Sequence, residues 1–158
     1  MNVRVRPASL QDGVAVLELL EEVGYYPEPI AFAKTYRKTL SDPHFLVRVA
    51  EEEGRLLGVM GIQDKGAVAL VRHAYVRPAT QKKGVGTKLL RYVESLACKP
   101  VLIGTWADAS WAIEFYRRNG YTVVSDSHKE RLLRTYWSIP ERQIETSVVL
   151  ADRRWMET

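Results

Sequence analysis

The chain has 158 residues, of which 46% are hydrophobic and 27% are charged, the balance of one soluble globular domain with a sizeable core. No apolar run reaches membrane-spanning length, and the N-terminal MNVRVRPASL contains no apolar signal segment. Cys98, the single cysteine, excludes an internal disulfide, and one cysteine with three scattered histidines offers no metal-ligand spacing, so we expect a cytoplasmic protein with no membrane partner and no metal.

The first third of the chain predicts one strand and two helices. Residues 3–6 alternate as a half-buried strand. Ser9 and Asp12 have the spacing of a capping box, which predicts a helix start there. The expected apolar stripe of that helix consists of Leu10, Val14, Leu17 and Leu20. The segment YYPEP at 25–29 ends the helix, and a second helix is expected over about 29–41.

The middle of the chain predicts an antiparallel meander and a helix. Three apolar segments lie at about 44–50, 55–64 and 67–77, and the turn sequences EEEGR and DKG separate them. A helical pattern follows over about 85–97.

The last third predicts short strands and helices in alternation. A buried strand is expected at 101–104 and a helix around Tyr116, which Gly120 can end in a left-handed cap. A strand is expected at 121–126. The connection over about 127–144 is long enough to contain a helix at 128–137, and a final strand follows at 146–150.

A glycine-containing loop stands where the third strand of the meander ends and the next helix begins. Gly84 and Gly86 let the main chain approach a ligand closely, and the first N–H groups of a helix lack internal partners and carry partial positive charge. Such a site suits phosphate or pyrophosphate. Residues 72–99 contain seven Lys and Arg residues and one Glu, which favours a polyanionic cofactor over a general nucleic-acid surface.

Two motifs carry a resemblance to a known family. The order Gln81-x-x-Gly84-x-Gly86, after a strand that closes on Val76-x-Pro78, resembles the coenzyme A loop of the GNAT N-acetyltransferases. The pattern Ala112-x-x-Phe115-Tyr116-x-x-x-Gly120-Tyr121 resembles the second coenzyme A motif of the same superfamily. The resemblance covers roughly residues 3–126.

The chain departs from the family pattern at one position. Many members carry Asn three residues before the alanine of the second motif, where this chain has Ala109. Either Ser110 or Asp108 could substitute for that Asn, or both could serve only as helix caps.

The resemblance implies a fold, an activity and a cofactor. The fold is the acyl-CoA N-acyltransferase fold of the α/β (α+β) class, a mixed, mostly antiparallel sheet flanked by helices. A single domain is expected over 1–158, with its core at 3–126 and a C-terminal helix and final strand at 127–151. The implied activity is transfer of an acetyl group from acetyl-CoA to a primary amine. The implied cofactor-binding residues are Tyr75, Val76, Gln81, Lys82, Lys83, Gly84, Val85, Gly86, Thr87 and Tyr116.

Two residues are candidates for catalysis. Tyr116 could hydrogen-bond or protonate the departing thiolate, although ordinary pKa values make full proton transfer uphill by about 2 kcal/mol. Some relatives use a carboxylate base on the fourth strand, where this chain has Leu70. His73 titrates in the right range, but strand alternation is expected to separate it from Leu70, Arg72 and Ala74. A water relay or Glu145 is the alternative base.

The acceptor and other functions stay open at this stage. The acceptor is a small-molecule or peptide amine, and the two segments that could select it are Tyr25-Tyr26-Pro27 and the connection with Tyr136 and Trp137. The same two aromatics could instead pack the added helix or bury a homodimer contact. A non-catalytic coenzyme A sensor is the alternative function, and a nucleic-acid partner is disfavoured.

Overall fold

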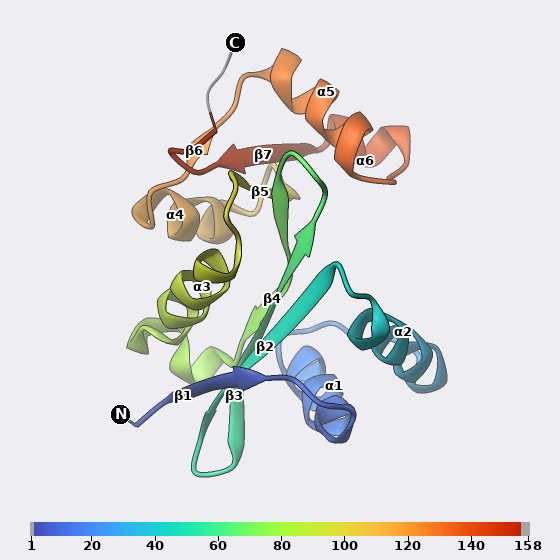
Figure 1. Cartoon of the computed structure of the whole chain (residues 1–158), viewed down its shortest axis with the longest axis vertical. Helices are drawn as coiled ribbons and strands as arrows, with labels where there is room; N and C mark the ends of the chain where they lie inside the picture. Colours follow the sequence, from blue (N-terminus) through green and yellow to red (C-terminus); the bar gives the residue numbers. More distant parts are fainter. Residues whose placement is uncertain (1, 156–158) are drawn as a thin grey trace. The chain divides into compact units, whose positions relative to one another are not determined.

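The structure is a computed structural model that describes residues 2–155, in which helices and strands follow one another along the chain (Figure 1). The chain divides into two compact units. The first consists of Met1–Asp64 and Arg72–Leu96, and the second of Lys65–Val71 and Ala97–Thr158. Strand β4 (Ala69–Val76) has its first residues in the second unit and its last residues in the first.

The first unit contains an antiparallel sheet. Its strands, in their order along the sheet, are β1 (Arg4–Pro7), β2 (Phe45–Glu52), β3 (Arg55–Asp64) and the end of β4. β2 pairs antiparallel with both β1 and β3. The carbonyls of Arg72 and Tyr75 on β4 approach Gly61 and Gly58 on β3 respectively. Residue numbers thus rise along β4 as they fall along β3, so the two strands are antiparallel. The predicted meander is therefore confirmed.

Helices cover both faces of this sheet. They are α1 (Gly13–Glu22), α2 (Pro29–Ser41) and α3 (Val85–Leu96), with short 3-10 helices η1 (Leu10–Asp12) and η2 (Pro78–Lys83). Figure 1 shows α1 and α2 on one side of β3 and α3 on the other. A Cβ on Gly58 would lie 2.9 Å from Leu89 of α3, whereas Val59 packs in the core cluster with Leu19 of α1. Because successive side chains of β3 point to opposite faces of the sheet, α3 packs on one face and α1 packs on the other.

The predicted apolar stripe of α1 is right at Leu20 but wrong at Leu10 and Val14. The buried residues of α1 are Val16, Leu19 and Leu20, while Val14 is 72% exposed. The reason is that Leu10–Asp12 form a 3-10 turn and the α-helix begins only at Gly13. A 3-10 turn has about 3.0 residues instead of 3.6, so the side chains that follow face other directions than a continuous α-helix would give.

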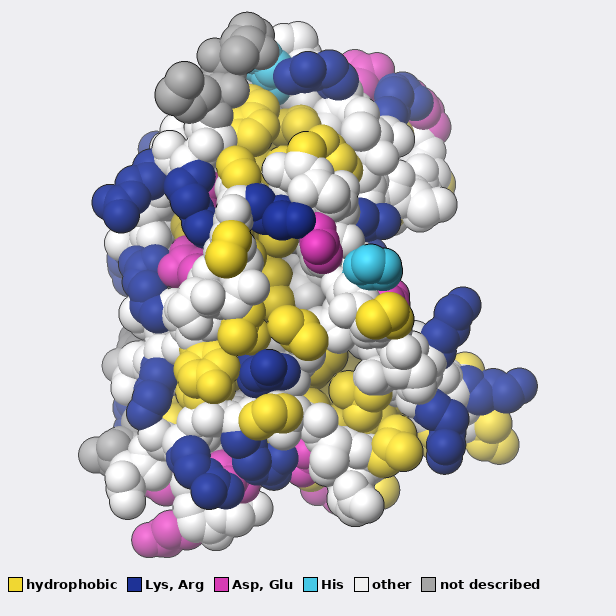
Figure 2. All heavy atoms as spheres, in the orientation of Figure 1, with side chains coloured by type: hydrophobic (Ala, Val, Ile, Leu, Met, Phe, Trp, Pro, Cys, Tyr) yellow, Lys and Arg dark blue, Asp and Glu magenta, His cyan; other side chains and the backbone are white. Residues whose placement is uncertain are grey.

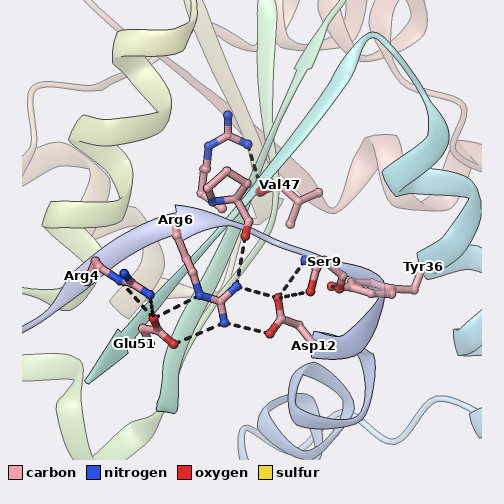
Figure 3. A network of polar contacts seen from close by, with 9 residues as sticks. Arg4, Arg6, Ser9, Asp12, Tyr36, Val47 and Glu51 are labelled. Carbon is pink, nitrogen blue, oxygen red and sulfur yellow. Dashed lines mark hydrogen bonds and ion pairs between the residues drawn. The ribbon is translucent and has the colours of Figure 1, made fainter. Parts of the chain in front are cut away.

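A network of charged groups joins β1, β2 and η1 (Figure 3). Arg6 donates to both oxygens of Asp12 at 2.8 and 2.9 Å and to Glu51 at 3.3 Å. Asp12 also accepts the backbone N–H of Ser9 at 2.8 Å, the contact that the capping box predicts. The Tyr36 hydroxyl donates to the Ser9 carbonyl at 2.7 Å, so α2 is tied to the same point.

The second unit contains its own part of the sheet. Residues 69–71 of β4 pair parallel with β5 (Val101–Trp106), which pairs antiparallel with β7 (Ser147–Ala151), which in turn pairs antiparallel with β6 (Thr122–Val123). The mixed, mostly antiparallel character of the predicted sheet is confirmed. The strand expected at 121–126 is shorter than predicted.

Three helices accompany the strands of the second unit, namely α4 (Ser110–Arg118), α5 (Asp126–Tyr136) and α6 (Glu141–Glu145). Helix α6 was not predicted. Leu132 and Leu133 of α5 pack with Leu70 and Leu102 in a buried cluster. Trp137 packs against the same cluster, and a Cβ on Gly104 would lie 3.1 Å from its ring. Trp137 therefore has the packing role that was one of its alternatives.

The Arg6 network predicts a specific loss of acid stability. Hydrogen bonds from Arg6 lower the pKa of Asp12 from 3.8 to about 2. A group whose pKa is depressed in the folded state stabilises the fold above its unfolded pKa, and this contribution disappears as the pH falls from about 4 to about 2. Asp12→Asn should therefore lower the unfolding free energy at pH 7 by about 2 kcal/mol. It should also weaken the decrease of the unfolding free energy between pH 4 and pH 2.

Denaturant unfolding between pH 2 and pH 7 measures this effect. Asp108→Asn, at an exposed position of the second unit, is the matched control and should leave the pH dependence unchanged. Parallel acid limbs for Asp12→Asn and the parent would show that the network does not stabilise the fold.

Candidate functional site

The loop after β4 is held in shape by its own hydrogen bonds. The Gln81 side-chain amide donates to the Val76 carbonyl at 3.1 Å, and the Thr80 hydroxyl donates to the Arg77 carbonyl at 3.0 Å. The chain runs through η2 and then through Gly84, whose φ of 81° lies in the left-handed region that favours glycine. Gln81 thus fastens the loop to the end of the strand.

The start of α3 presents backbone donors. Lys88 N–H donates to the Gly84 carbonyl at 3.0 Å as the first turn closes, so the N–H groups of Val85, Gly86 and Thr87 precede the intrahelical ladder. The Val85 side chain is buried and Gly86 has none, so these residues offer backbone to a ligand. Free N–H groups at the positive end of a helix dipole suit a phosphate.

Few of the basic side chains of 72–99 are free for a ligand. Arg77 pairs with Glu22, and Arg91 pairs with Glu94 at 2.8 Å. Lys88 donates to the Val3 carbonyl, and Lys99 donates to the Gly66 carbonyl in the second unit. Lys83 is exposed, while the side chain of Lys82 lies outside the described part. The charge count therefore overstates the positive charge at the loop.

Another basic surface of the first unit lies on α2. Dark-blue side chains gather over this helix in Figure 2, where Lys34, Arg37 and Lys38 are exposed. They line a shallow groove together with Ile30, Ala33 and Ser41. Positive charge by itself consequently does not locate the cofactor site, and the backbone geometry of the loop is the better indicator.

Strand β4 contains a left-handed residue. His73 has φ = 56°, a region where His is several-fold more common than most other residues. The His73 ring stacks on Phe45 at 5.8 Å between ring centroids, and Arg72 donates to Gln63 at 3.1 Å. Phe45 and Gln63 are register partners and lie on one face of the sheet.

The expectation that alternation separates His73 from Arg72 is therefore wrong. The left-handed residue interrupts the period of two, and both side chains contact the same face of the first unit. No local sequence pattern indicates this conformation at His73, because a left-handed residue is most often Gly or Asn. For the same reason, the sequence analysis did not name Arg72 as a candidate.

The electrostatics of this face favour neutral groups. Desolvation lowers the pKa of His73, and the neighbouring Arg72 charge lowers it further, although part of the imidazole reaches solvent. Tyr75 stacks on Tyr25 at 6.4 Å, and burial, followed by the nearby Tyr25, raises the pKa of Tyr75. His73 is thus an uncharged imidazole at neutral pH, beside an aromatic wall.

Tyr116 lies in the second unit on α4. It is 7% exposed, and its ring makes edge contacts with Phe115 at 5.1 Å and Tyr121 at 5.9 Å. Tyr121 N–H donates to the Tyr116 carbonyl at 3.0 Å, and Gly120 has φ = 95°. This is the predicted left-handed cap, in Schellman form. Burial raises the pKa of Tyr116 to about 12.

The remaining sequence candidates take different positions. Leu70 is fully buried in the core of the second unit, and Glu145 is exposed on α6. Ala109 is buried at the N-cap of α4, and no side chain caps this helix. The capping role considered for Asp108 and Ser110 is therefore not found. Among residues 2–155 no helix has the length and apolar character to cross a bilayer, and no cluster of three or more metal-ligating side chains is formed.

A family description matches the chain. The acetyltransferase (GNAT) domain family matches residues 42–123, a segment that includes β4, the loop after it and α4. The PaiA N-acetyltransferase from Thermoplasma acidophilum, solved in complex with coenzyme A, has a similar fold with a TM-score of 0.69 at 18% identity. That match covers 96% of this chain and 99% of the other.

Two curated relatives are similar in sequence. An S-(2-succino)cysteine N-acetyltransferase from Bacillus subtilis is 34% identical over 87 residues, which cover 46% of this chain and about half, 52%, of the relative. The peptidyl-lysine N-acetyltransferase YiaC from Escherichia coli is 24% identical over 152 residues, which cover 90% of this chain and 99% of the relative.

The loop predicts the effect of a charge at the start of α3. Gly86→Asp places a carboxylate where a phosphate would meet the free N–H groups, so acetyl-CoA binding should be lost. Titration calorimetry with acetyl-CoA measures this, and circular dichroism checks the fold. Ser95→Asp puts the same charge on the exposed last turn of α3 and should bind normally. Full affinity in a folded Gly86→Asp variant would refute the loop assignment.

Proposed function

We propose that this chain, which belongs to the acetyltransferase (GNAT) family, transfers the acetyl group of acetyl-CoA to a primary amine by direct attack of the amine on the thioester. Membership of the family makes the chain an N-acetyltransferase with acetyl-CoA as its donor. The identity of the acceptor and the roles of individual residues are proposals.

The observation that carries the proposal is the loop from Gln81 to Thr87. Gly84 turns the chain in a left-handed conformation, and α3 then begins with N–H groups that have no intrahelical acceptor. This arrangement suits the pyrophosphate of coenzyme A. We assign the loop residues, including Lys82 and Lys83, to cofactor binding, together with Tyr75 and Val76 at the end of β4.

The reaction requires a neutral amine and a stabilised oxyanion. A backbone N–H near Tyr75 or Val76 is our candidate for binding the carbonyl oxygen as it gains charge. His73 is our candidate for the base that takes the amine proton, directly or through water. Its lowered pKa supports this role, because the imidazole is unprotonated and ready to accept a proton at neutral pH.

We assign Tyr116 the role of hydrogen-bond donor to the departing sulfur. A phenol whose pKa is about 12 cannot readily protonate a thiolate whose conjugate acid has a pKa of about 8.5, since the transfer is uphill by about 5 kcal/mol. Burial thus keeps the hydroxyl protonated and limits it to donating a hydrogen bond. Tyr116 should assist the reaction without being indispensable.

The acceptor is a small-molecule or peptide amine. The two curated relatives are named for S-(2-succino)cysteine and for peptidyl-lysine, which both carry a primary amine. Tyr25 and Tyr26, which are 54% and 74% exposed, offer an aromatic surface for it. We also propose a cytoplasmic location, because Cys98 is an exposed free thiol that suits a reducing compartment.

The amine-dependent release of coenzyme A from acetyl-CoA tests the activity. The purified protein should release coenzyme A with at least one member of a panel of amino acids, polyamines and lysine peptides. Mass spectrometry of the product should show a mass gain of one acetyl group. Binding of acetyl-CoA without transfer to any amine would support a non-catalytic sensor, the alternative function, instead.

Tyr116→Phe separates chemistry from packing. The variant keeps the ring and loses the hydroxyl, so kcat should fall by about ten- to a hundredfold while the Kd for acetyl-CoA stays the same. Because the tyrosine stays protonated until the pH nears 12, the pH profiles of parent and variant should be parallel below about pH 10. Phe115→Leu, which changes a neighbouring ring, is the control for packing. An unchanged kcat in a variant whose chemistry is rate-limiting would contradict the role.

A further inference from the structure

We propose that Arg72 binds a free carboxylate of the acceptor, and that the acceptor is therefore an amino acid or a similar small acid whose carboxylate lies close to the reacting amine. This inference rests on the proposed function and names its substrate class. Nothing in the family motifs concerns Arg72, since its position precedes the coenzyme A loop.

Arg72 is a desolvated cation without a counterion in the described part of the chain. The side chain is half-buried, and its guanidinium donates to the neutral amide of Gln63 at 3.1 Å. Desolvation lowers the pKa of Arg72, yet a guanidinium stays charged. Partly buried charges are normally paired, because an unpaired charge loses its hydration without compensation. An anionic group of a ligand would supply the missing partner.

Other arginines of the first unit show the contrast. Arg6 has Asp12 and Glu51, and Arg77 has Glu22. These ion pairs use acidic groups of other elements, namely η1, β2 and α1. Arg72, the neighbour of His73 on β4, has no such acidic partner among the described residues.

The surroundings of Arg72 form an accessible surface. The left-handed backbone at His73 places both side chains over the face that Phe45 and Gln63 line. Tyr75 belongs to the same apolar cluster as Phe45 and stacks on Tyr25, which is 54% exposed. A ligand on this face would meet a guanidinium, a neutral imidazole and aromatic rings.

The spacing selects the class of acceptor. Arg72 and His73 are consecutive, so their Cα atoms are about 3.8 Å apart. If His73 takes the proton of the amine, a carboxylate on Arg72 must lie within a few bonds of that amine, as in an α-amino acid. A lysine side chain within a peptide has no such carboxylate. A polyamine would bring a second cation toward Arg72, which repels it.

Acceptors that differ only in their carboxylate test, with the parent enzyme, whether the acceptor carboxylate is recognised. Amino acids are compared with their carboxamides and with the corresponding decarboxylated amines by rates of coenzyme A release. We expect kcat/KM to be about 10- to 100-fold higher for the acid, as expected for hydrogen bonds between charged groups. Equal kcat/KM values for acid and carboxamide would overturn the inference without touching the proposed function.

Variants then assign the preference to Arg72. Arg72→Gln should lower kcat/KM for the acid to the level of the carboxamide, mainly through KM, with unchanged carboxamide kinetics and unchanged affinity for acetyl-CoA. Arg72→Lys should restore part of the preference. Arg48→Gln is the matched control, because the Nε of Arg48 also lacks a partner. Arg48 follows Val47 on β2, and Val47 packs in the same cluster as Phe45. The Arg48 side chain therefore lies on the other face of the sheet from Phe45 and Arg72. An equal loss for acid and carboxamide in Arg72→Gln would show a structural role only.

The two proposals can fail separately. If no amine releases coenzyme A, the proposed function fails, and calorimetry with the amino acids and their carboxamides decides the carboxylate site by itself. Binding of the acid that Arg72→Gln abolishes would support the site in that case. Equal binding to parent and variant would overturn it.

Discussion

The guanidinium of Arg6 is the contact on which the arrangement of the first unit depends. It bridges Asp12 and Glu51, so it fixes β1 to β2 and at the same time fixes the point where α1 starts. Tyr36 of α2 donates to the Ser9 carbonyl beside it. The start of α1 and the middle of α2 are therefore tied to one point, and the segment between the two helices carries Tyr25, which stacks on Tyr75 of β4. The ion network thus holds the two helices whose connection carries an aromatic surface of the candidate site.

Main-chain geometry shapes two features of the candidate site, one in β4 and one in the loop that follows it. The left-handed conformation of His73 brings its imidazole and the Arg72 guanidinium to one face, where regular alternation would have separated them. The loop that follows Val76 ends in the left-handed Gly84 and leaves the first N–H groups of α3 available. At His73 the backbone conformation sets the face on which the side chains lie. At Gly84 it sets the direction of the backbone N–H groups that follow.

In the candidate site, the environment shifts the pKa values of His73, Tyr75 and Tyr116 so that their neutral forms are favoured. Burial raises the pKa of Tyr116 and of Tyr75, and desolvation lowers the pKa of His73. Neutral groups suit a reaction in which a neutral amine attacks a thioester. Arg72 keeps its charge, because a guanidinium does not lose its proton in proteins. In the proposed mechanism, uncharged groups would transfer the proton and donate hydrogen bonds, and a cation would recognise the acceptor.

Local sequence signals predicted much of this protein. The break at YYPEP indicated where α2 begins, and periodicity predicted α3 almost to the residue. Turn residues predicted the β2–β4 meander, and Ser9 and Gly120 indicated their caps. Each of these features depends on neighbours in the chain. The phase of α1, the left-handed His73 and the ion pair that occupies Arg77 were decided only by the tertiary structure. A 3-10 turn fixed by Arg6, a ring stacked on Phe45 and a carboxylate brought from another helix are contacts between distant segments, and no local pattern encodes them.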